Sequence, residues 1–353
     1  MTDNSKYLRN TWYVAALSTE IHQEKMLRRI FLETSVVLYR KKDGAVAALH
    51  DRCPHRFAPL SMGRLEGDDV VCPYHGLRFD CTGKCNNNPH GNGHIPAKAE
   101  VRSFPVMERH GFVWIWMGDL PADEAQLPDY STLDQGHPNG IGYVYMPFPC
   151  YYELITDNVM DLSHVDHLHS EIISTRGKLS PLIPKPVEND GQISVRWDWK
   201  QTPAQLIFKE FMPEPEAEAR QYVTVTWAKP TNIELVVGAT QDPDAKLVYG
   251  ERNVVGQYDL HCCTPQDENN THYFFATRRN RKEECAEYNQ MKIDAMHGAF
   301  ANEDGPMLKA VHEEMKTTDF LSLNPVLISS DTGPVRVRRL LAQLIEAENR
   351  ASS

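Results

Sequence analysis

The sequence contains little that would place the protein in a membrane, outside the cell or on nucleic acid. No apolar run approaches the roughly 20 residues that a membrane-spanning helix requires. The first residues, MTDNSK, lack the apolar segment of a secretory signal. The formal net charge of −11 argues against a phosphate-binding surface, which needs clustered Lys and Arg. We therefore expect a cytoplasmic protein with no membrane partner and no nucleic-acid partner.

Cysteine is sparse, and the eight cysteines do not form the pattern of a disulfide scaffold. We expect free thiols in a reducing compartment. A glycine-rich dinucleotide-binding motif and a flavin-binding motif are also absent from the sequence. Any electrons used by this chain would therefore come from a separate protein.

Residues 53–76 combine cysteine and histidine in a pattern typical of an iron–sulfur cluster. The run CPH at 53–55 and the run CPYHG at 72–76 each supply one Cys and one His. In a Rieske [2Fe–2S] cluster, two Cys bind one iron and two His bind the other. A structural zinc site is the alternative, but zinc fingers usually group two Cys and then two His. The pattern predicts a Rieske cluster bound by Cys53, His55, Cys72 and His75.

The expected secondary structure of the chain changes near residue 120. Up to residue 117 the sequence predicts short strands broken by turns, including a hairpin over 36–49 with Asp43-Gly44 at its turn. A segment rich in Pro, Gly and Asp follows, which predicts a linker over 121–140. We expect an all-β domain over 1–120 and a second domain over 141–353.

The second domain is predicted to pack an antiparallel sheet against one long helix, which makes the fold class α+β. The first expected helix covers 153–168. Strands are then expected over 192–200, 222–229, 233–240, 247–263 and 272–279, and helices over 282–300, onward to 316, and over 335–349.

A second group of potential metal ligands lies in the run DNVMDLSHVDHLH at 157–169. Asn158, Asp161 and His164 are spaced by three residues and would share one face of a helix. His169 lies five residues beyond His164, so both can bind one metal only if the helix ends or contains a π-bulge between them. Two His and one carboxylate form the facial triad of non-haem Fe(II) oxygenases.

Spacing alone leaves several ligand choices open. His164 and His169 are the preferred imidazoles, with His167 as the alternative because His164 and His167 suit a regular helix better. The third ligand could be Asp161, Asp166 or a carboxylate distant in the sequence. The run could also be a solvated polar helix face.

These motifs resemble those of the Rieske non-haem iron aromatic-ring oxygenases, and most closely the oxygenase components of the vanillate and dicamba O-demethylase type. The resemblance rests on CPH…CPYHG, on NPHGNG at 88–93 and on the run at 157–169, with a weaker match at Glu303-Asp304. It implies a Rieske domain followed by a helix-grip (START-like) catalytic domain.

The resemblance also implies roles for individual residues. His164, His169 and Asp304 would bind Fe(II), and Asn158 would lie near the iron. Asp161 would connect an iron-bound His to a cluster His of a neighbouring subunit. The alternative for Asp304 is a helix N-cap ahead of a Gly-Pro pair.

The substrate pocket is less well defined by the resemblance. His261 would lie in it and could hydrogen-bond a substrate carboxylate or ether oxygen, although a His bonded to a neighbour on a sheet face is the alternative. Ala295 stands near the place where the dicamba type carries a Trp. The pocket is therefore expected to have a different shape.

The implied reaction uses O2 and electrons from a separate flavin-containing, NAD(P)H-dependent reductase, with or without a ferredoxin. We expect O-demethylation of a methoxylated aromatic acid to a phenol and formaldehyde by a homotrimer. Ring or methyl hydroxylation of another aromatic substrate is the first alternative. An electron carrier without a mononuclear iron, and a binding module with structural zinc, are more distant ones.

Overall fold

The computed structural model describes residues 5–169, 173 and 175–352, and the chain divides into two compact units. The first unit contains the chain up to Leu127 together with Thr264–Asp267, and the second contains the remainder. The return of residues 264–267 to the first unit was not predicted. Thr264 donates to the Val14 carbonyl at 2.7 Å, and the Leu32 amide donates to the Pro265 carbonyl at 2.9 Å, which explains this assignment.

The first unit is an all-β unit with three antiparallel sheets in its described residues. The first sheet has the order β1 (Trp12–Leu17), β10 (Phe112–Trp116) and β9 (Val106–Arg109). The second has β2 (Met26–Phe31), β3 (Thr34–Arg40) and β4 (Val46–His50). The third has β5 (Arg64–Glu66), β6 (Asp69–Val71), β7 (Arg78–Phe79) and β8 (Cys85–Asn87).

Strand β3 is buried on both faces and connects two parts of the core. Its side chains alternate in direction, as in any strand. Val36 and Leu38 pack into the cluster of the first two sheets. Val37 and Tyr39 pack into a separate core cluster that contains Cys53 and Cys72. The predicted hairpin over 36–49 is thus present as β3–β4, and it supports the cysteine loops.

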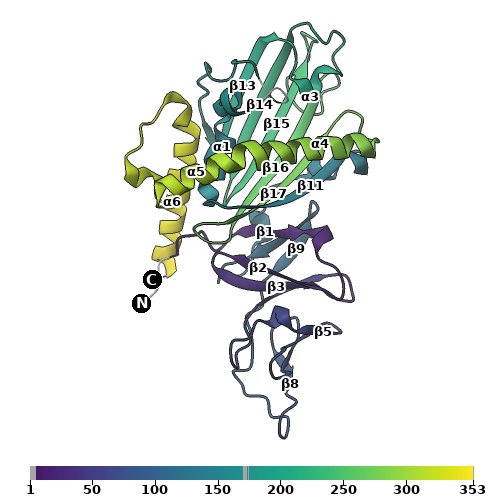
Figure 1. The fold of residues 1–353 in the computed structure, drawn as a ribbon, viewed down its shortest axis with the longest axis vertical. Coiled ribbons are helices and arrows are strands. Elements are labelled where there is room, and N and C mark those ends of the chain that lie inside the picture. Colours follow the sequence, from purple (N-terminus) through teal and green to yellow (C-terminus); the bar gives the residue numbers. More distant parts are fainter. Residues whose placement is uncertain (1–4, 170–172, 174, 353) are drawn as a thin grey trace. The chain divides into compact units, whose positions relative to one another are not determined.

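The second unit is built on one antiparallel sheet of seven strands, seen in Figure 1. Its order is β11 (Ile141–Phe148), β17 (Thr271–Arg279), β16 (Val255–Pro265), β15 (Asn232–Thr240), β14 (Ala219–Ala228), β13 (Gln192–Thr202) and β12 (Val187–Asn189). The strand predicted over 247–263 begins only at Val255, because a turn with Gly250 at φ +85° precedes it. The α+β prediction is confirmed.

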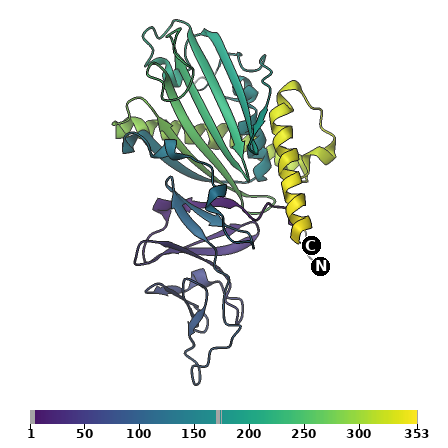
Figure 2. The ribbon, with the colours of Figure 1, turned by 180° about the vertical axis from the view of Figure 1, so that it is seen from behind.

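Helices α4 and α5 lie across one face of this sheet, as Figures 1 and 2 show from opposite sides. None of the helices in the described part of the chain has both the length and the apolar character needed to cross a membrane. The α-helices are α1 (Tyr152–Met160), α2 (Val165–Leu168), α3 (Leu206–Lys209), α4 (Ala286–Ala299), α5 (Gly305–Met315) and α6 (Thr332–Ser352), and a π-helical turn η7 (Phe300–Asp304) joins α4 to α5. Short 3₁₀ turns are η1 (Ser18–Glu20), η2 (Leu60–Met62), η3 (Glu124–Gln126), η4 (Ser131–Asp134), η5 (Pro138–Gly140), η6 (Leu162–His164), η8 (Phe320–Leu323) and η9 (Ser329–Asp331).

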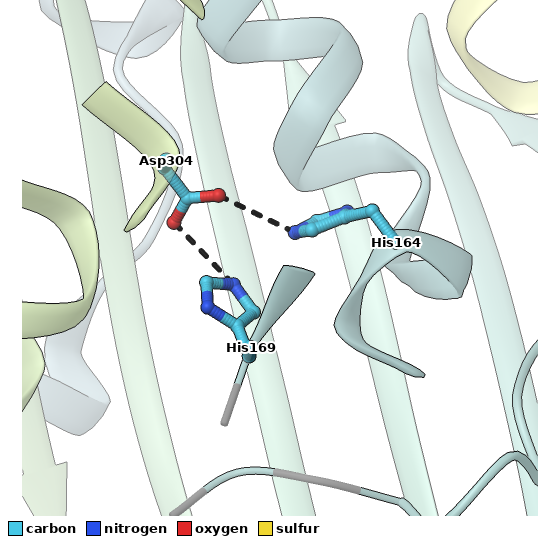
Figure 3. A group of neighbouring side chains, drawn as sticks. All are labelled: His164, His169 and Asp304. Atoms are coloured by element: carbon cyan, nitrogen blue, oxygen red, sulfur yellow. Dashed lines mark ion pairs between the residues drawn. The ribbon is translucent and has the colours of Figure 1, made fainter. Parts of the chain in front are cut away.

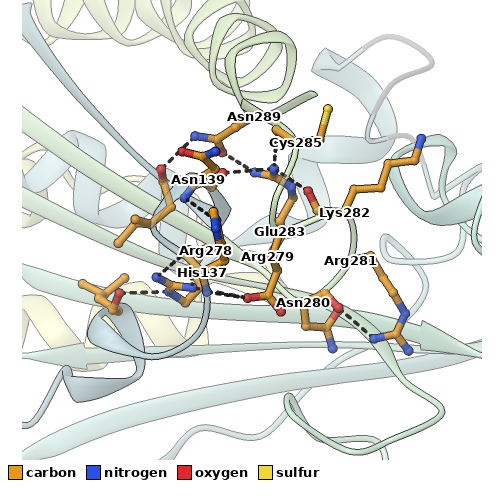
Figure 4. A network of polar contacts seen from close by, with 12 residues as sticks. His137, Asn139, Arg278, Arg279, Asn280, Arg281, Lys282, Glu283, Cys285 and Asn289 are labelled. Carbon is orange, nitrogen blue, oxygen red and sulfur yellow. Dashed lines mark hydrogen bonds and ion pairs between the residues drawn. The ribbon is translucent and has the colours of Figure 1, made fainter. Parts of the chain in front are cut away.

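Two buried arginines at the end of β17 fix the start of α4 (Figure 4). Arg278 donates to the Leu133 carbonyl at 2.9 Å. Arg279 donates to the carbonyls of Asn139 and Cys285, each at 3.1 Å. Leaving the N–H groups of a buried guanidinium unpaired is costly, so these bonds hold η4, η5 and the N-terminus of α4 against the sheet.

A third buried arginine holds α6 against α1. Arg338 donates to both carboxylate oxygens of Asp157, at 2.9 and 2.8 Å, and to Glu153 at 2.5 Å. Burial raises the pKa of Glu153 to about 7, and the Arg338 charge opposes that rise. The guanidinium therefore compensates two carboxylates on the helix that also carries Asn158.

We expect Arg338→Met to lower the free energy of unfolding by about 3–5 kcal/mol, because two buried carboxylates would lose their partner. Arg336→Met is the matched control, since Arg336 lies two residues away in an exposed ion pair with Glu188 and should cost less than about 1 kcal/mol. Urea unfolding of both variants measures the difference. Equal, small shifts of the two midpoints would contradict this role.

Candidate metal centres and substrate pocket

The helix predicted over 153–168 ends early, and its end shapes the metal site. Helix α1 stops at Met160, and Asp161 leaves the helix with φ −122° and ψ 92°. The Asp161 carboxylate then accepts from the Ser163 amide at 2.9 Å and caps the turn η6. Helix α2 follows and ends before His169, which is extended at φ −88° and ψ 139°. A helix end, and not a π-bulge, brings His169 toward the same point as His164.

The π-helical turn lies instead at Asp304, the last residue of η7. The Asp304 side chain makes no capping hydrogen bond to the start of α5, so it does not act as the N-cap that was the alternative. It is 1% exposed and faces the two histidines. Burial raises the pKa of the Asp304 carboxyl, and the imidazoles of His169 and His164 oppose that rise.

His164, His169 and Asp304 converge on one point (Figure 3). Nε2 of His164 lies 3.6 Å from Oδ1 of Asp304, and Nε2 of His169 lies 3.4 Å from Oδ2. One ligand atom from each residue lies within 4.8 Å of the other two. These three residues could bind a mononuclear iron as a facial triad, which leaves coordination positions open.

Hydrogen bonds fix the tautomers of both histidines so that Nε2 faces the carboxylate. Nδ1 of His164 donates to the backbone carbonyl of Asp161 at 2.6 Å. Nδ1 of His169 donates to the Glu303 carboxylate at 2.5 Å. Burial lowers the pKa of His164, which favours the neutral imidazole that a metal requires. The chemistry of the donor set therefore fits Fe(II).

The structure also places the other residues of the run. Asn158 donates to Oδ1 of Asp304 at 2.9 Å and so orients the carboxylate. Asp161 contacts His164 through its backbone carbonyl and not through its carboxylate. His167 is exposed and lies 2.9 Å from the Ser180 hydroxyl, away from the triad. Asp166 accepts from the backbone amides of Gly177, Leu179 and Ser180 and holds that loop.

Glu303 received no role from the sequence beyond its place in the Glu303-Asp304 match. A carboxylate that bonds the distal nitrogen of a metal-binding His fixes its ring and raises its basicity. The position of Glu303 directly before Asp304 was the available signal for this role. On a regular helix, however, the two side chains would point in different directions, so the sequence did not predict that both face His169.

The two cysteine–histidine loops of the first unit have equivalent backbone turns. The Phe57 amide donates to the Cys53 carbonyl at 2.9 Å, and the Gly76 amide donates to the Cys72 carbonyl at 3.1 Å. Both cysteines are buried, and the rings of His55 and His75 lie 4.5 Å apart between centroids. Burial raises the pKa of the Cys53 thiol to about 11, so a thiolate there requires a bound metal.

The NPHGNG run covers the second of these loops. His90 Nε2 lies 2.8 Å from the His75 carbonyl. Gly76 adopts φ +72°, and a Cβ there would lie 3.1 Å from Cγ of Pro89. The donor set and the close packing of the loops fit a [2Fe–2S] cluster with two Cys and two His ligands.

A mostly apolar pocket in the second unit reaches the triad. Its wall includes one face of the sheet, with Val223, Leu235 and Val237, and the helical residues Met296 and Phe300. His261 also lines it, so the structure places this residue where the resemblance implied. Ring-shaped substrates suit such a lining, because apolar walls exclude water and leave a few polar groups to orient the ligand.

We expect Asp304→Ala to lose most of the mononuclear iron while keeping the cluster, because the variant removes the one carboxylate ligand. Iron and acid-labile sulfide per chain should fall from three iron and two sulfide to two and two. Asp294→Ala, on the exposed side of α4, is the matched control and should keep all three iron. Unchanged iron in the Asp304 variant would exclude this carboxylate as a ligand.

Glu303→Leu should lower Fe(II) affinity about 10- to 100-fold, since His169 would lose the acceptor that orients it. Glu303→Gln retains a neutral acceptor and should fall between this variant and the natural protein. Competition with a chelator, on protein depleted of mononuclear iron but retaining its cluster, measures the affinities. Affinities in the order natural, Leu, Gln would contradict the role of the hydrogen bond.

Comparison with known proteins finds a known protein family for each part of the chain. Residues 11–105 match the Rieske [2Fe-2S] domain, and residues 148–347 match the vanillate O-demethylase oxygenase C-terminal domain. The chain is 34% identical to the dicamba O-demethylase oxygenase component of Stenotrophomonas maltophilia, over 97% of this chain and 99% of that one. It is 33% identical to the chloroacetanilide N-alkylformylase oxygenase component of Rhizorhabdus wittichii, over 98% and 97%.

One solved structure is similar to this chain over nearly its whole length. Dicamba monooxygenase bound to 3,6-dichlorosalicylic acid has a TM-score of 0.87 and 34% identity, and the match covers 97% of this chain and 98% of that one. Another structure of dicamba monooxygenase contains non-haem iron and dicamba.

Proposed function

This chain belongs to the Rieske oxygenases of the vanillate O-demethylase type, and we propose that it demethylates an aromatic methyl ether. The predicted family is confirmed, and with it the class of oxidoreductase that receives electrons from a separate reductase. The observation that carries the proposal is the triad of His164, His169 and Asp304 at a mostly apolar pocket. Relatives named for O-demethylation of dicamba and of vanillate support this choice of reaction.

The overall reaction balances with two electrons. An aryl methyl ether, O2, two electrons and two protons give a hemiacetal and water. The hemiacetal then collapses to a phenol and formaldehyde. The reductase supplies the electrons, so the chain needs no dinucleotide site of its own.

When bound, the cluster transfers single electrons and the mononuclear iron activates O2. The residues of the chain prepare that site. The Asp161 carbonyl and the Glu303 carboxylate hold the Nδ1 protons, so that both Nε2 lone pairs face the metal position. The Asn158 amide orients the Asp304 carboxylate. The apolar wall excludes water from the substrate and positions an aromatic ring.

Partners and location follow from the same proposal. We assign an NAD(P)H-dependent, flavin-containing reductase, with or without a ferredoxin, and a homotrimer. In such a ring, Asp161 would connect the iron site of one subunit to the cluster of its neighbour. None of the eight cysteines forms a disulfide, and Cys53 and Cys72 would bind the cluster, which supports a reducing cytoplasm.

The more distant alternatives have less support. An electron carrier would not require three converging metal ligands at a mostly apolar pocket. A zinc-binding module does not account for the Rieske domain match over 11–105.

We expect the reconstituted protein, with a reductase and a methoxy-aromatic substrate, to release one formaldehyde for each O2 consumed. Asp304→Ala should release none and should retain the Rieske EPR signal after reduction by dithionite. A hydroxylated product that retains its methoxy group would contradict O-demethylation and favour ring or methyl hydroxylation. Formation of no oxidised product would contradict the proposed function.

A further inference from the structure

Strand β16 directs three polar side chains at the pocket. Gln257, Asp259 and His261 alternate along the strand, so they point to the same face of the sheet. All three line the pocket together with the triad. On the neighbouring strand β15, Leu235 pairs with Asp259 and is apolar, so the polar row lies beside an apolar one.

Asp259 and His261 each leave one polar atom unpartnered within the described residues. Both side chains are 1% exposed. Oδ2 of Asp259 accepts from the Gln257 amide at 2.7 Å, whereas Oδ1 has no partner there. Nδ1 of His261 lies 2.6 Å from the Tyr273 hydroxyl, whereas Nε2 has none. Burying such atoms without a partner is costly, which indicates that a ligand pairs with them.

Beyond the metal position, the described side chains of the pocket offer no positive charge to an anionic ligand. They include the carboxyl of Asp259 and neither Lys nor Arg, while Asp304 would be bound to Fe(II), whose charge offsets its own. Burial lowers the pKa of His261 to about 3, so its imidazole is neutral. Burial raises the pKa of Asp259 to about 7. Hydrogen bonds from Thr277 and Gln257 oppose that rise, and so does the charge of Lys292 of α4, which is buried but does not line the pocket. A substrate carboxylate placed beside Asp259 would therefore lose its hydration without gaining a cationic side chain among the described lining residues.

We propose that Asp259 and His261 are specificity-determining residues that select an uncharged aromatic substrate with an N–H or O–H donor, such as an amide or a phenol. Oδ1 of Asp259 accepts the donor, and Nε2 of His261 pairs with the neighbouring polar atom of the same group. The inference rests on the proposed function and replaces the aromatic acid expected from the resemblance.

The test compares binding of matched acids and amides to the holoenzyme without O2. The probes are the 2-, 3- and 4-methoxybenzamides and the corresponding methoxybenzoates, measured by isothermal titration. At least one amide should bind about tenfold or more tightly than its acid, a difference of about 1.4 kcal/mol. Binding of no amide, or equal or tighter binding of every acid, overturns the proposal.

Two variants separate selection from a structural role. Asp259→Asn removes the carboxylate charge and should bring the amide-to-acid ratio close to one, mainly by improving binding of the acid. Lys292→Gln removes the opposing charge and should retain the preference for the amide. If Asp259 served only to pair with Lys292, both variants would lose thermal stability and keep the natural ratio, and the proposal would fail.

Formaldehyde release distinguishes this inference from the proposed function. An amide that binds with the expected preference but yields no formaldehyde supports the selected substrate class and contradicts O-demethylation. Formaldehyde released preferentially from acids supports O-demethylation and contradicts the role of Asp259. If Asp259→Asn does not accumulate as folded protein, the ratio measured on the natural protein decides the proposal by itself.

Discussion

The carboxylate of Asp304 is buried almost completely. The arrangement of the second unit depends on the groups that pair with its negative charge. Removing a carboxylate from water is costly unless other groups pair with it. Here the Asn158 amide donates to one oxygen, and the Nε2 atoms of His164 and His169 face both. Two imidazole lone pairs and a carboxylate repel one another, whereas all three attract a cation. A metal ion therefore completes the balance that the protein groups leave open.

That arrangement requires two helical segments to hold fixed positions on the sheet. Helix α1 carries Asn158, and the buried ion pair of Arg338 with Asp157 and Glu153 attaches it to α6. Helix α4 leads to Asp304, and the carbonyl contacts of Arg279 set its start. In both places a buried guanidinium makes several hydrogen bonds, so a displaced helix would leave charges unpaired. The anchors lie outside the triad, but they limit how far its ligands can move.

The same sheet that supports the helices provides the selective wall of the pocket. Apolar side chains from β14 and β15 suit an aromatic ring, whereas β16 contributes polar side chains at alternate positions. Because Asp259 is the carboxyl that remains in this pocket once Asp304 binds a metal, and the described lining residues include neither Lys nor Arg, we expect the wall to select for charge as well as shape. A common catalytic centre can therefore serve different substrates when one strand changes its inward-facing residues.

The sequence by itself determined the type of cluster, the family and the α+β class, because short motifs such as CPH and CPYHG and the order of strands and helices are enough to identify them. Spacing alone left Asp161, Asp166 and a distant carboxylate as candidates for the third iron ligand, and the family resemblance implied Asp304. Only the tertiary structure shows how His164, His169 and Asp304 converge, because a helix end at Asp161 and a π-helical turn at Asp304 bring together residues far apart in the chain. The contact of Asp161 through its carbonyl, the hydrogen bond of Glu303 and the unpartnered oxygen of Asp259 likewise arise from packing. Local spacing specifies which side chains share a strand or a turn, whereas burial and pairing across the sheet specify which of them meet.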